Sequence, residues 1–274
     1  MNGRQERASA FPAVAVALSI AVIGAADGQQ APAATKVISA IDLAKPFGTR
    51  SRWSFVATQG PDQKSGFDDE PIPGEVVLCL KRAREPACSP AMRSMARPPS
   101  PDYEISWRPH YLNDARLVYP RGRSAPPLLL VQTASTYSGD GDQVRYTQLL
   151  AYRPTGDRFE AIFTRDTGRN NNQEVRFIDS GPLAGNVVVA EPTSNAPFGY
   201  WITVSRLDPN YTYRQVLRYR SATHYADNNP LPVIDSEMPN LQQRLGLWRP
   251  GKPLPLPAKG CPKPRLVRME LWCS

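Results

Sequence analysis

The stretch LLLVQTAS (128–135), followed by VRYTQLLAY (144–152) and DRFEAIFT (157–164), decides the fold class of this chain. Each run is short and rich in Leu, Val, Tyr, Phe and Thr, and turn-forming residues separate one run from the next. Aliphatic, β-branched and aromatic runs bounded by Gly, Pro, Asn and Asp are typical of strands. The stretch therefore predicts three consecutive antiparallel strands.

A second copy of this pattern follows as VVVAEPTS (187–194), GYWITVSRL (199–207) and YTYRQVLRY (211–219). Corresponding aromatic residues in the third run of each copy are 54 residues apart. Such spacing suits a three- or four-stranded meander that is repeated once over residues 128–220, as in propeller blades. A two-sheet sandwich or a barrel accommodates the same strands, so these architectures remain alternatives.

Short runs of the same kind extend over most of the chain and predict an all-β, antiparallel fold. The predicted strands are Trp53–Thr58, Glu75–Lys81, Tyr103–Trp107, Ala115–Tyr119, Leu128–Ala134, Val144–Tyr152, Arg158–Thr164, Glu174–Ile178, Asn186–Ala190, Tyr200–Leu207, Tyr211–Tyr219 and Arg265–Trp272. The chain also contains 29 prolines in 274 residues, about twice the usual share. Because proline breaks helix interiors, long helices are excluded as the main structure.

The two ends of the predicted domain, 36–274, differ from the rest of it in their sequence patterns. Residues 36–44 are expected to form one or two helical turns, with Val37, Ile38 and Ile41 on one side. The sequence NLQQRLGLW (240–248) is expected to form a second short helix. The segment 250–264 is too rich in proline for a sheet, so it is expected to lie extended over the surface.

Residues 1–26 have the layout of a secretory signal peptide. Arg4 and Arg7 precede an uncharged apolar run at 11–23, and small residues follow that run. The polar stretch 27–35 is then expected to be a flexible linker. The sequence thus predicts a periplasmic or secreted protein, with membrane attachment only if the leader is retained.

The four cysteines are expected to form disulfides, because an even number of cysteines in an exported chain favours bridges over reactive thiols. The pairs Cys79–Cys88 and Cys261–Cys273 each close a short local loop, so this pairing is favoured among the three that are possible. A four-cysteine zinc site is disfavoured, because its ligands usually come in closer pairs.

If the formal net charge of +8 reflects a partner, it favours an anionic envelope component over nucleic acid, and the alternative is that the charge has no specific partner. Another envelope protein is the alternative partner, and nucleic acid is not expected for an exported chain. The basic residues are interpreted as scattered along the sequence.

No motif for a cofactor, a phosphate loop or a nucleophilic serine occurs in the sequence, so no cofactor or metal is predicted. The weak catalytic candidates are His224, Asp235 and Glu237, which lie within the densest cluster of potential acids and oxygen ligands. Asp140 and Asp142 are spaced as at the start of a calcium loop, but such a sequence is also common at a hairpin tip.

The candidate ligand-binding residues are Tyr200, Trp201, Arg214 and Arg218. Strict alternation along 211–220 predicts an inner face with Tyr211, Tyr213 and Tyr219 and an outer face with the arginines. Packed aromatic residues usually form a core, and the alternative is a surface that stacks on sugars or peptides.

These observations lead to one functional hypothesis and two alternatives. We expect an exported, non-enzymatic binding or envelope-interaction protein. The first alternative is an exported hydrolase that acts on glycan or ester substrates through His224, Asp235 and Glu237. The second is a component of an assembly that a retained leader tethers to the inner membrane.

Overall fold

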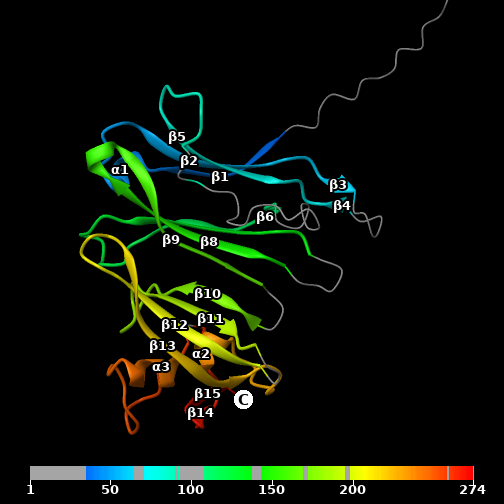
Figure 1. Ribbon diagram of the computed structural model, residues 1–274, viewed down its shortest axis with the longest axis vertical. Coiled ribbons are helices and arrows are strands. Elements are labelled where there is room, and N and C mark those ends of the chain that lie inside the picture. Colours follow the sequence, from blue (N-terminus) through cyan, green and yellow to red (C-terminus); the bar gives the residue numbers. More distant parts are fainter. Residues whose placement is uncertain are drawn as a thin grey trace, which may run out of the picture. The chain divides into compact units, whose positions relative to one another are not determined.

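The computed structural model describes residues 35–64, 71–89, 92, 108–137, 143–168, 172–194, 198–257 and 259–273. All of them belong to one compact unit, Ala34–Ser274. Antiparallel strands dominate this unit, which confirms the all-β class (Figure 1). The predicted strand 103–107, Asp140, Asp142 and the leader lie outside the described residues.

Three antiparallel sheets form the unit, and we call them the first, middle and third sheets. The first sheet has the order β1-β2-β5, the middle sheet β6-β7-β8-β9 and the third sheet β10-β11-β12-β13. Their strands are β1 (Lys36–Asp42), β2 (Trp53–Gln59), β5 (Val76–Arg82), β6 (Tyr111–Val118), β7 (Leu128–Ala134), β8 (Arg145–Arg153), β9 (Arg158–Thr167), β10 (Glu174–Phe177), β11 (Val187–Pro192), β12 (Gly199–Leu207) and β13 (Tyr213–His224).

Smaller elements complete the unit. They are the helical turn α1 (Ala44–Phe47), the two-residue strands β3 (Gln63–Lys64) and β4 (Pro71–Ile72), the 3-10 turn η1 (Pro154–Gly156), the helices α2 (Val233–Ser236) and α3 (Met238–Arg244), and the hairpin strands β14 (Pro264–Val267) and β15 (Glu270–Cys273).

The sequence repeat corresponds to the middle and third sheets. The first copy forms β7, β8 and β9, and the second copy forms β11, β12 and β13, each in meander order. A further strand, β6 or β10, precedes each copy and pairs with its first strand. Each repeat unit is therefore a four-stranded sheet rather than a three-stranded one.

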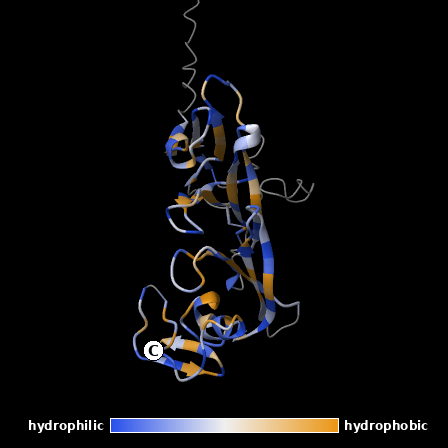
Figure 2. Cartoon of the chain, turned by 90° about the vertical axis from the view of Figure 1, so that its left-hand side faces the viewer, coloured by the Kyte–Doolittle hydropathy of each residue, from blue (hydrophilic) through white to orange (hydrophobic). Residues whose placement is uncertain are grey.

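The middle sheet is buried on both faces, which explains the uninterrupted apolar sequence of β7. Leu129 and Val131 pack into a core shared with the first sheet. Leu128 and Leu130 pack on the opposite side, into a core shared with the third sheet. Figure 2 shows hydrophobic residues along the strands of these sheets. A sheet with neighbours on both faces is part of a stack, whereas each sheet of a two-sheet sandwich has one inner face.

The other face of the third sheet packs against the C-terminal helices. Val188 of β11 and Ile202 of β12 contact a cluster that includes Ile234 of α2 and Leu241 of α3. The sequence NLQQRLGLW thus contributes its first half to a short helix, as expected, and that helix covers the end of the sheet stack.

One extra residue in β13 changes the side-chain pattern predicted for this strand. Val204 of β12 pairs with Leu217 of β13. The next residue of β12, Ser205, pairs with Gln215, so Val216 is an unpaired bulge residue. A bulge reverses which face the following side chains occupy.

The prediction that Tyr213 and Tyr219 share an inner face is therefore wrong. Tyr213 packs against the core between the middle and third sheets. Tyr219 packs on the opposite side, against the C-terminal helices. The bulge lets a single strand supply aromatic side chains to two separate cores.

The expected N-terminal helix over 36–44 is also wrong for most of that range. Residues Lys36–Asp42 form the edge strand β1, which pairs with β2 from Lys36↔Gln59 to Asp42↔Ser54. Helical structure is confined to α1, in which Pro46 is tolerated because its missing N–H would be unpaired in a first turn. Pairing with a neighbouring strand outweighed the local helical pattern.

At the C-terminal end, the expected strand 265–272 is a hairpin, with a turn at Arg268 and Met269 between β14 and β15. Both residues have positive φ angles. The segment 253–257 before the hairpin has neither helix nor strand, in agreement with its high proline content.

Both expected disulfides are present, Cys79–Cys88 and Cys261–Cys273. The first bridges β5 and the loop that follows it, and the second ties the end of β15 to the segment before β14. Two disulfides in one small domain indicate an oxidising compartment.

Candidate ligand-binding cleft

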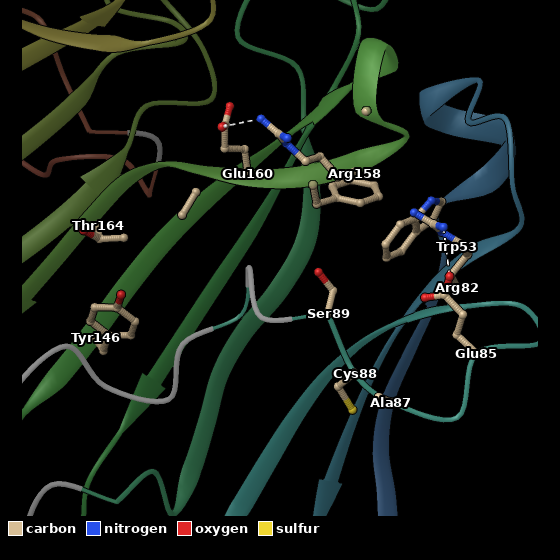
Figure 3. A pocket seen from close by; sticks show the side chains of 13 residues that line it. Trp53, Arg82, Glu85, Ala87, Cys88, Ser89, Tyr146, Arg158, Glu160 and Thr164 are labelled. Carbon is tan, nitrogen blue, oxygen red and sulfur yellow. Dashed lines mark hydrogen bonds and ion pairs between the residues drawn. The ribbon is translucent and has the colours of Figure 1, made fainter.

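A cleft of about 890 Å³ opens between the first and middle sheets (Figure 3). This volume lies within the range of ligand-binding pockets. One wall comes from β2, β5 and the loop after β5, and the other from β8, η1 and β9. The lining residues are Trp53, Arg82, Glu85, Ala87, Cys88, Ser89, Tyr146, Gly156, Arg158, Phe159, Glu160, Ala161 and Thr164.

Buried aromatic rings form the floor of the cleft. Trp53, Tyr146 and Phe159 are each no more than 3% exposed. The rings of Trp53 and Phe159 meet edge to face with their centroids 5.4 Å apart. Phe47 of α1 also contacts the Phe159 ring, and the centroids of these two rings are 4.9 Å apart. Because edge-to-face pairs are favourable and rigid, the floor is preformed.

The turn after β8 fastens the two walls together at one end of the cleft. Asp157 accepts hydrogen bonds from Trp53 Nε1 at 3.1 Å and from the Tyr152 hydroxyl at 2.6 Å. The Arg82 guanidinium donates to the backbone oxygen of Asp157 at 2.9 Å. We call this set of contacts the Asp157 latch.

The electrostatics of the latch favour an ionised carboxylate. Burial by itself would raise the pKa of Asp157, but hydrogen bonds from Ser51, Tyr152 and Trp53 outweigh it and lower this pKa to about 2. The Arg82 guanidinium also lies over the Trp53 ring, 5.1 Å from its centroid. An aromatic ring, a cation and a carboxylate thus join β2 and β5 of the first sheet to the turn between β8 and β9.

The rim of the cleft carries charges of both signs in equal number. On one wall Arg82 donates to Glu85 at 2.8 Å, and on the other Arg158 pairs with Glu160 at 3.5 Å (Figure 3). Arg153 donates to the same Glu160 carboxylate at 2.6 Å. The rim therefore has no strong preference for an anionic or a cationic ligand, and the aromatic floor favours partly apolar groups.

The backbone of β9 supplies a further binding element. Among the described residues β9 pairs only with β8, so one side of this strand has no strand partner. An unpaired edge offers N–H and C=O groups to an extended polypeptide, which then joins the sheet as an additional strand.

The opposite wall is held in place by the first disulfide. The chain turns back after β5, and the Ser89 amide donates to the Leu80 carbonyl at 2.8 Å. Cys79 and Cys88 bridge the same two segments. The wall that includes Glu85 and Ala87 is therefore a constrained loop of the kind that a ligand can meet without a large ordering cost.

The three predicted catalytic residues have separate partners in the structure. His224 is exposed, and its amide donates to Asp227 at 3.1 Å. Asp235 is ion-paired with Arg176. Glu237 is completely buried. The structure therefore places these side chains in three different environments and not in a shared cleft.

The Glu237 carboxylate connects the third sheet to the C-terminal helices. It accepts hydrogen bonds from the backbone amides of Ala222 and Thr223, both at 2.9 Å. The Tyr219 hydroxyl donates at 2.9 Å and the Asn240 side-chain amide at 2.8 Å. Burial and the Glu237 charge together raise the pKa of Tyr219. These contacts indicate that the Glu237 carboxylate has a structural role.

The four predicted ligand-binding residues are divided between two faces of the third sheet. Tyr200 is fully buried on the helix side, and burial raises its pKa to about 12. Trp201 points the other way and is 38% exposed, with the Arg218 guanidinium 4.8 Å from its ring centroid. Arg214 lies near the turn before β13, where it pairs with Asp208 at 2.7 Å.

The cleft residues share no pattern in the sequence that marks them as a group. Arg82, Asp157 and Glu160 belong to three different segments, and each looks like an ordinary turn or strand residue in isolation. The alternation of Phe159 and Ala161 in β9 was the only local signal, and it indicated a strand rather than a site.

Comparisons with known proteins add no functional information, because no family model, no curated protein and no solved structure matches the chain. In the described part of the chain, no helix has the length and hydrophobicity to cross a bilayer. The same residues contain no group of three or more His, Cys, Asp or Glu side chains arranged to hold a metal ion.

Proposed function

We propose that this is an exported, non-enzymatic binding protein whose cleft between the first and middle sheets holds an extended segment of another envelope protein. One observation carries the proposal: the cleft of about 890 Å³ runs beside β9, an edge strand with no partner on one side among the described residues. Backbone pairing would supply affinity, and the rim would supply selectivity.

The composition of the cleft supports a polypeptide over a sugar acid or another anion. Arg82 and Arg158 are balanced by Glu85 and Glu160, so a strongly charged ligand would meet as much repulsion as attraction. The buried floor of Trp53 and Phe159 suits apolar side chains, which alternate naturally with polar ones along an extended peptide.

The sequence and the disulfides support the proposed location. Residues 1–26 have the layout of a signal peptide, and both disulfides require an oxidising compartment to persist. The hydrolase alternative gains no support from the placement of its candidates, because the Glu237 carboxylate is fully buried and occupied by structural hydrogen bonds, whereas His224 is exposed.

A peptide-display experiment tests the proposal with matched variants. Ala161→Trp and Ala87→Trp place a bulky ring in the cleft from opposite walls, and Ala83→Trp places the same ring on the exposed part of the same loop outside the cleft. Peptides selected on the wild-type protein from a random library should bind Ala83→Trp normally and bind both cleft variants about tenfold or more weakly, a loss of at least ~1.4 kcal/mol.

Two results would overturn the proposal. The first is selected peptides that bind all three variants equally, which would locate their site elsewhere. The second is a library that yields no peptide specific for the folded, disulfide-bonded protein.

A further inference from the structure

The excess positive charge of this protein is concentrated at its C-terminal end. Residues 241–274 contain seven of the 33 Lys and Arg residues but only one of the 25 Asp and Glu residues, so this segment holds +6 of the net +8. The basic residues themselves are scattered along the chain, as interpreted above, but the acidic residues that balance them in the preceding 240 residues are almost absent from this segment.

All seven cations of this segment are exposed. They are Arg244, Arg249, Lys252, Lys259, Lys263, Arg265 and Arg268. Within the described residues none of the seven forms an ion pair, whereas sheet arginines such as Arg82, Arg116 and Arg153 each pair with a carboxylate. The one acidic residue, Glu270, is buried and only 6% exposed. The surface is thus positive without internal compensation.

Exposed apolar side chains lie between these cations in the same segment. Leu247 and Leu256 are 41% and 48% exposed, and Leu266 and Val267 at the end of β14 are 37% and 36% exposed. We call the seven cations and these four apolar residues the basic–apolar surface. Its residues belong to the end of α3, the loop after α3, the proline-rich segment and the β14–β15 hairpin, which form the orange and red end of the ribbon (Figure 1).

Two structural features hold the basic–apolar surface in a defined shape. Cys261 is bridged to Cys273, so the hairpin cannot separate from the segment before it. The Trp248 indole donates to the Pro253 carbonyl at 2.8 Å, which closes the loop after α3. A preformed surface loses little conformational entropy when it docks.

We propose that the basic–apolar surface docks on an anionic phospholipid bilayer. Clustered Lys and Arg side chains are attracted to lipid phosphates, and interspersed Leu and Val side chains gain from entering the interface between headgroups and acyl chains. A soluble polyanion would satisfy the cations alone and would leave the four apolar side chains in water. The combination of both residue types therefore favours a lipid surface.

This inference deepens the proposed envelope role, but it uses a surface different from the cleft. Binding of peptides in the cleft and binding to vesicles are separate measurements, and the variants that affect one leave the other site intact. Failure of one proposal can therefore be distinguished from failure of the other.

Vesicle co-sedimentation of the purified, disulfide-bonded protein tests the inference. The protein should bind vesicles of equal parts phosphatidylglycerol and phosphatidylcholine, and binding should weaken as salt is added. Vesicles of phosphatidylcholine alone should bind little. Equal binding to both kinds of vesicle would overturn the inference, because it would show attachment that does not depend on lipid charge.

Matched charge reversals locate the binding surface. The triple variant Lys252→Glu, Lys259→Glu, Lys263→Glu should partition onto the anionic vesicles at least about a hundredfold more weakly, since the loss of each cation costs about fivefold and each new carboxylate adds repulsion. The control triple Lys36→Glu, Lys64→Glu, Lys81→Glu has the same net charge but leaves the C-terminal segment unchanged, so it should retain most of the binding. Equal losses in both triples would overturn the inference.

A second pair of variants separates lipid from a soluble polyanion. Leu266→Ser with Val267→Ser should weaken vesicle binding, while Val37→Ser with Val77→Ser, which changes exposed valines of the first sheet, should not. A soluble polyanion would be the ligand of this surface, in place of a lipid, if three results were obtained together. The protein would bind inorganic polyphosphate tightly, the Leu266→Ser, Val267→Ser variant would bind it equally well, and vesicle binding would be weak. Circular dichroism and a thermal melt confirm that each variant is folded.

Discussion

The Trp53 indole donates a hydrogen bond from Nε1 to Oδ1 of Asp157 over 3.1 Å, although the two residues are 104 positions apart in the sequence. This contact joins the first sheet to the turn between β8 and β9 and closes one end of the cleft. The third sheet is fastened to the middle sheet in a comparable way, because Arg153 donates to the carbonyls of Asn210 and Tyr211 in the turn before β13. Hairpin turns thus connect each sheet to the preceding one.

Replacement of Asp157 should loosen the first sheet. Asp157→Asn keeps a residue type that tolerates the φ of 42°, but it removes the charge, so we expect a loss of about 2 kcal/mol in the free energy of unfolding. Asp157→Ala should cost more, because it also removes the acceptor for Trp53. Urea unfolding followed by Trp fluorescence measures both losses, and equal stability of Asp157→Ala and wild type would refute the latch.

The same carboxylate predicts a dependence on acid. The pKa of Asp157 is lowered to about 2 from an ordinary value of 3.8, so the ionised form is stabilised in the folded state. The stabilisation of the folded state by the ionised Asp157 carboxylate is fully present above about pH 4 and is lost as the pH falls toward 2. Asp157→Asn should lose less stability than wild type across this range of pH, and parallel curves would contradict the assignment.

Two glycines with similar backbone angles should respond very differently to substitution. Gly185 and Gly181 both have φ near 80°. A Cβ at Gly185 would lie 2.2 Å from the Pro120 carbonyl oxygen, whereas a Cβ at Gly181 would meet nothing within 4 Å. Gly181→Ala should therefore cost about 1 kcal/mol from backbone strain alone, and Gly185→Ala several kcal/mol more.

Thermal denaturation of the two glycine variants tests this difference in stability. A similar melting temperature for Gly185→Ala and Gly181→Ala would show that the turn before β11 can move away from Pro120.

Glu237 should be required for stability and not for chemistry. Glu237→Gln turns an acceptor into a donor that faces the Tyr219 hydroxyl and the Asn240 amide, so we expect a loss of about 2–3 kcal/mol. Asp235→Asn, which weakens only the ion pair with Arg176, should cost less. Chemical denaturation compares the two, and a Glu237→Gln variant as stable as wild type would reopen a catalytic role.

The C-terminal hairpin should make stability depend on pH near neutrality. Burial, reinforced by the charges of Asp227 and Glu237 and opposed by the nearby Trp272 and Arg268 side chains, raises the pKa of Glu270 to about 7 from 4.5. The folded state therefore favours the protonated form, and stability should fall as the pH rises from about 4.5 to about 7.

Glu270→Gln isolates this effect because glutamine remains neutral at every pH. The variant should lose less stability than wild type between about pH 5 and about pH 8, by on the order of 3 kcal/mol. In the matched control Glu85→Gln, at an exposed carboxylate, the free energy of unfolding should change with pH as it does in wild type. If wild type and Glu270→Gln have the same slope, the carboxyl group of Glu270 is ionised in the folded protein already at low pH.

Local sequence was sufficient to predict most of the strands, the repeat and both disulfides. The apolar run of β7 and the alternation of Phe159 and Ala161 in β9 are patterns of closely spaced residues, so they can be recognised without knowledge of the neighbouring strands. Cys79 and Cys88 lie close in sequence, and the loop between them can close only over a short distance. These features depend on residues that are neighbours along the chain.

Tertiary structure alone decided the faces of β13, the nature of residues 36–42 and the location of the cleft. A single bulge residue, Val216, reversed the face of Tyr219 relative to Tyr213, and no local pattern reveals such an insertion. Pairing with β2 overrode the helical spacing of Val37 and Ile41. The cleft depends on contacts such as that between Trp53 and Asp157, which form only after the first and middle sheets have packed together. Strand propensity contains no information about which sheets become neighbours.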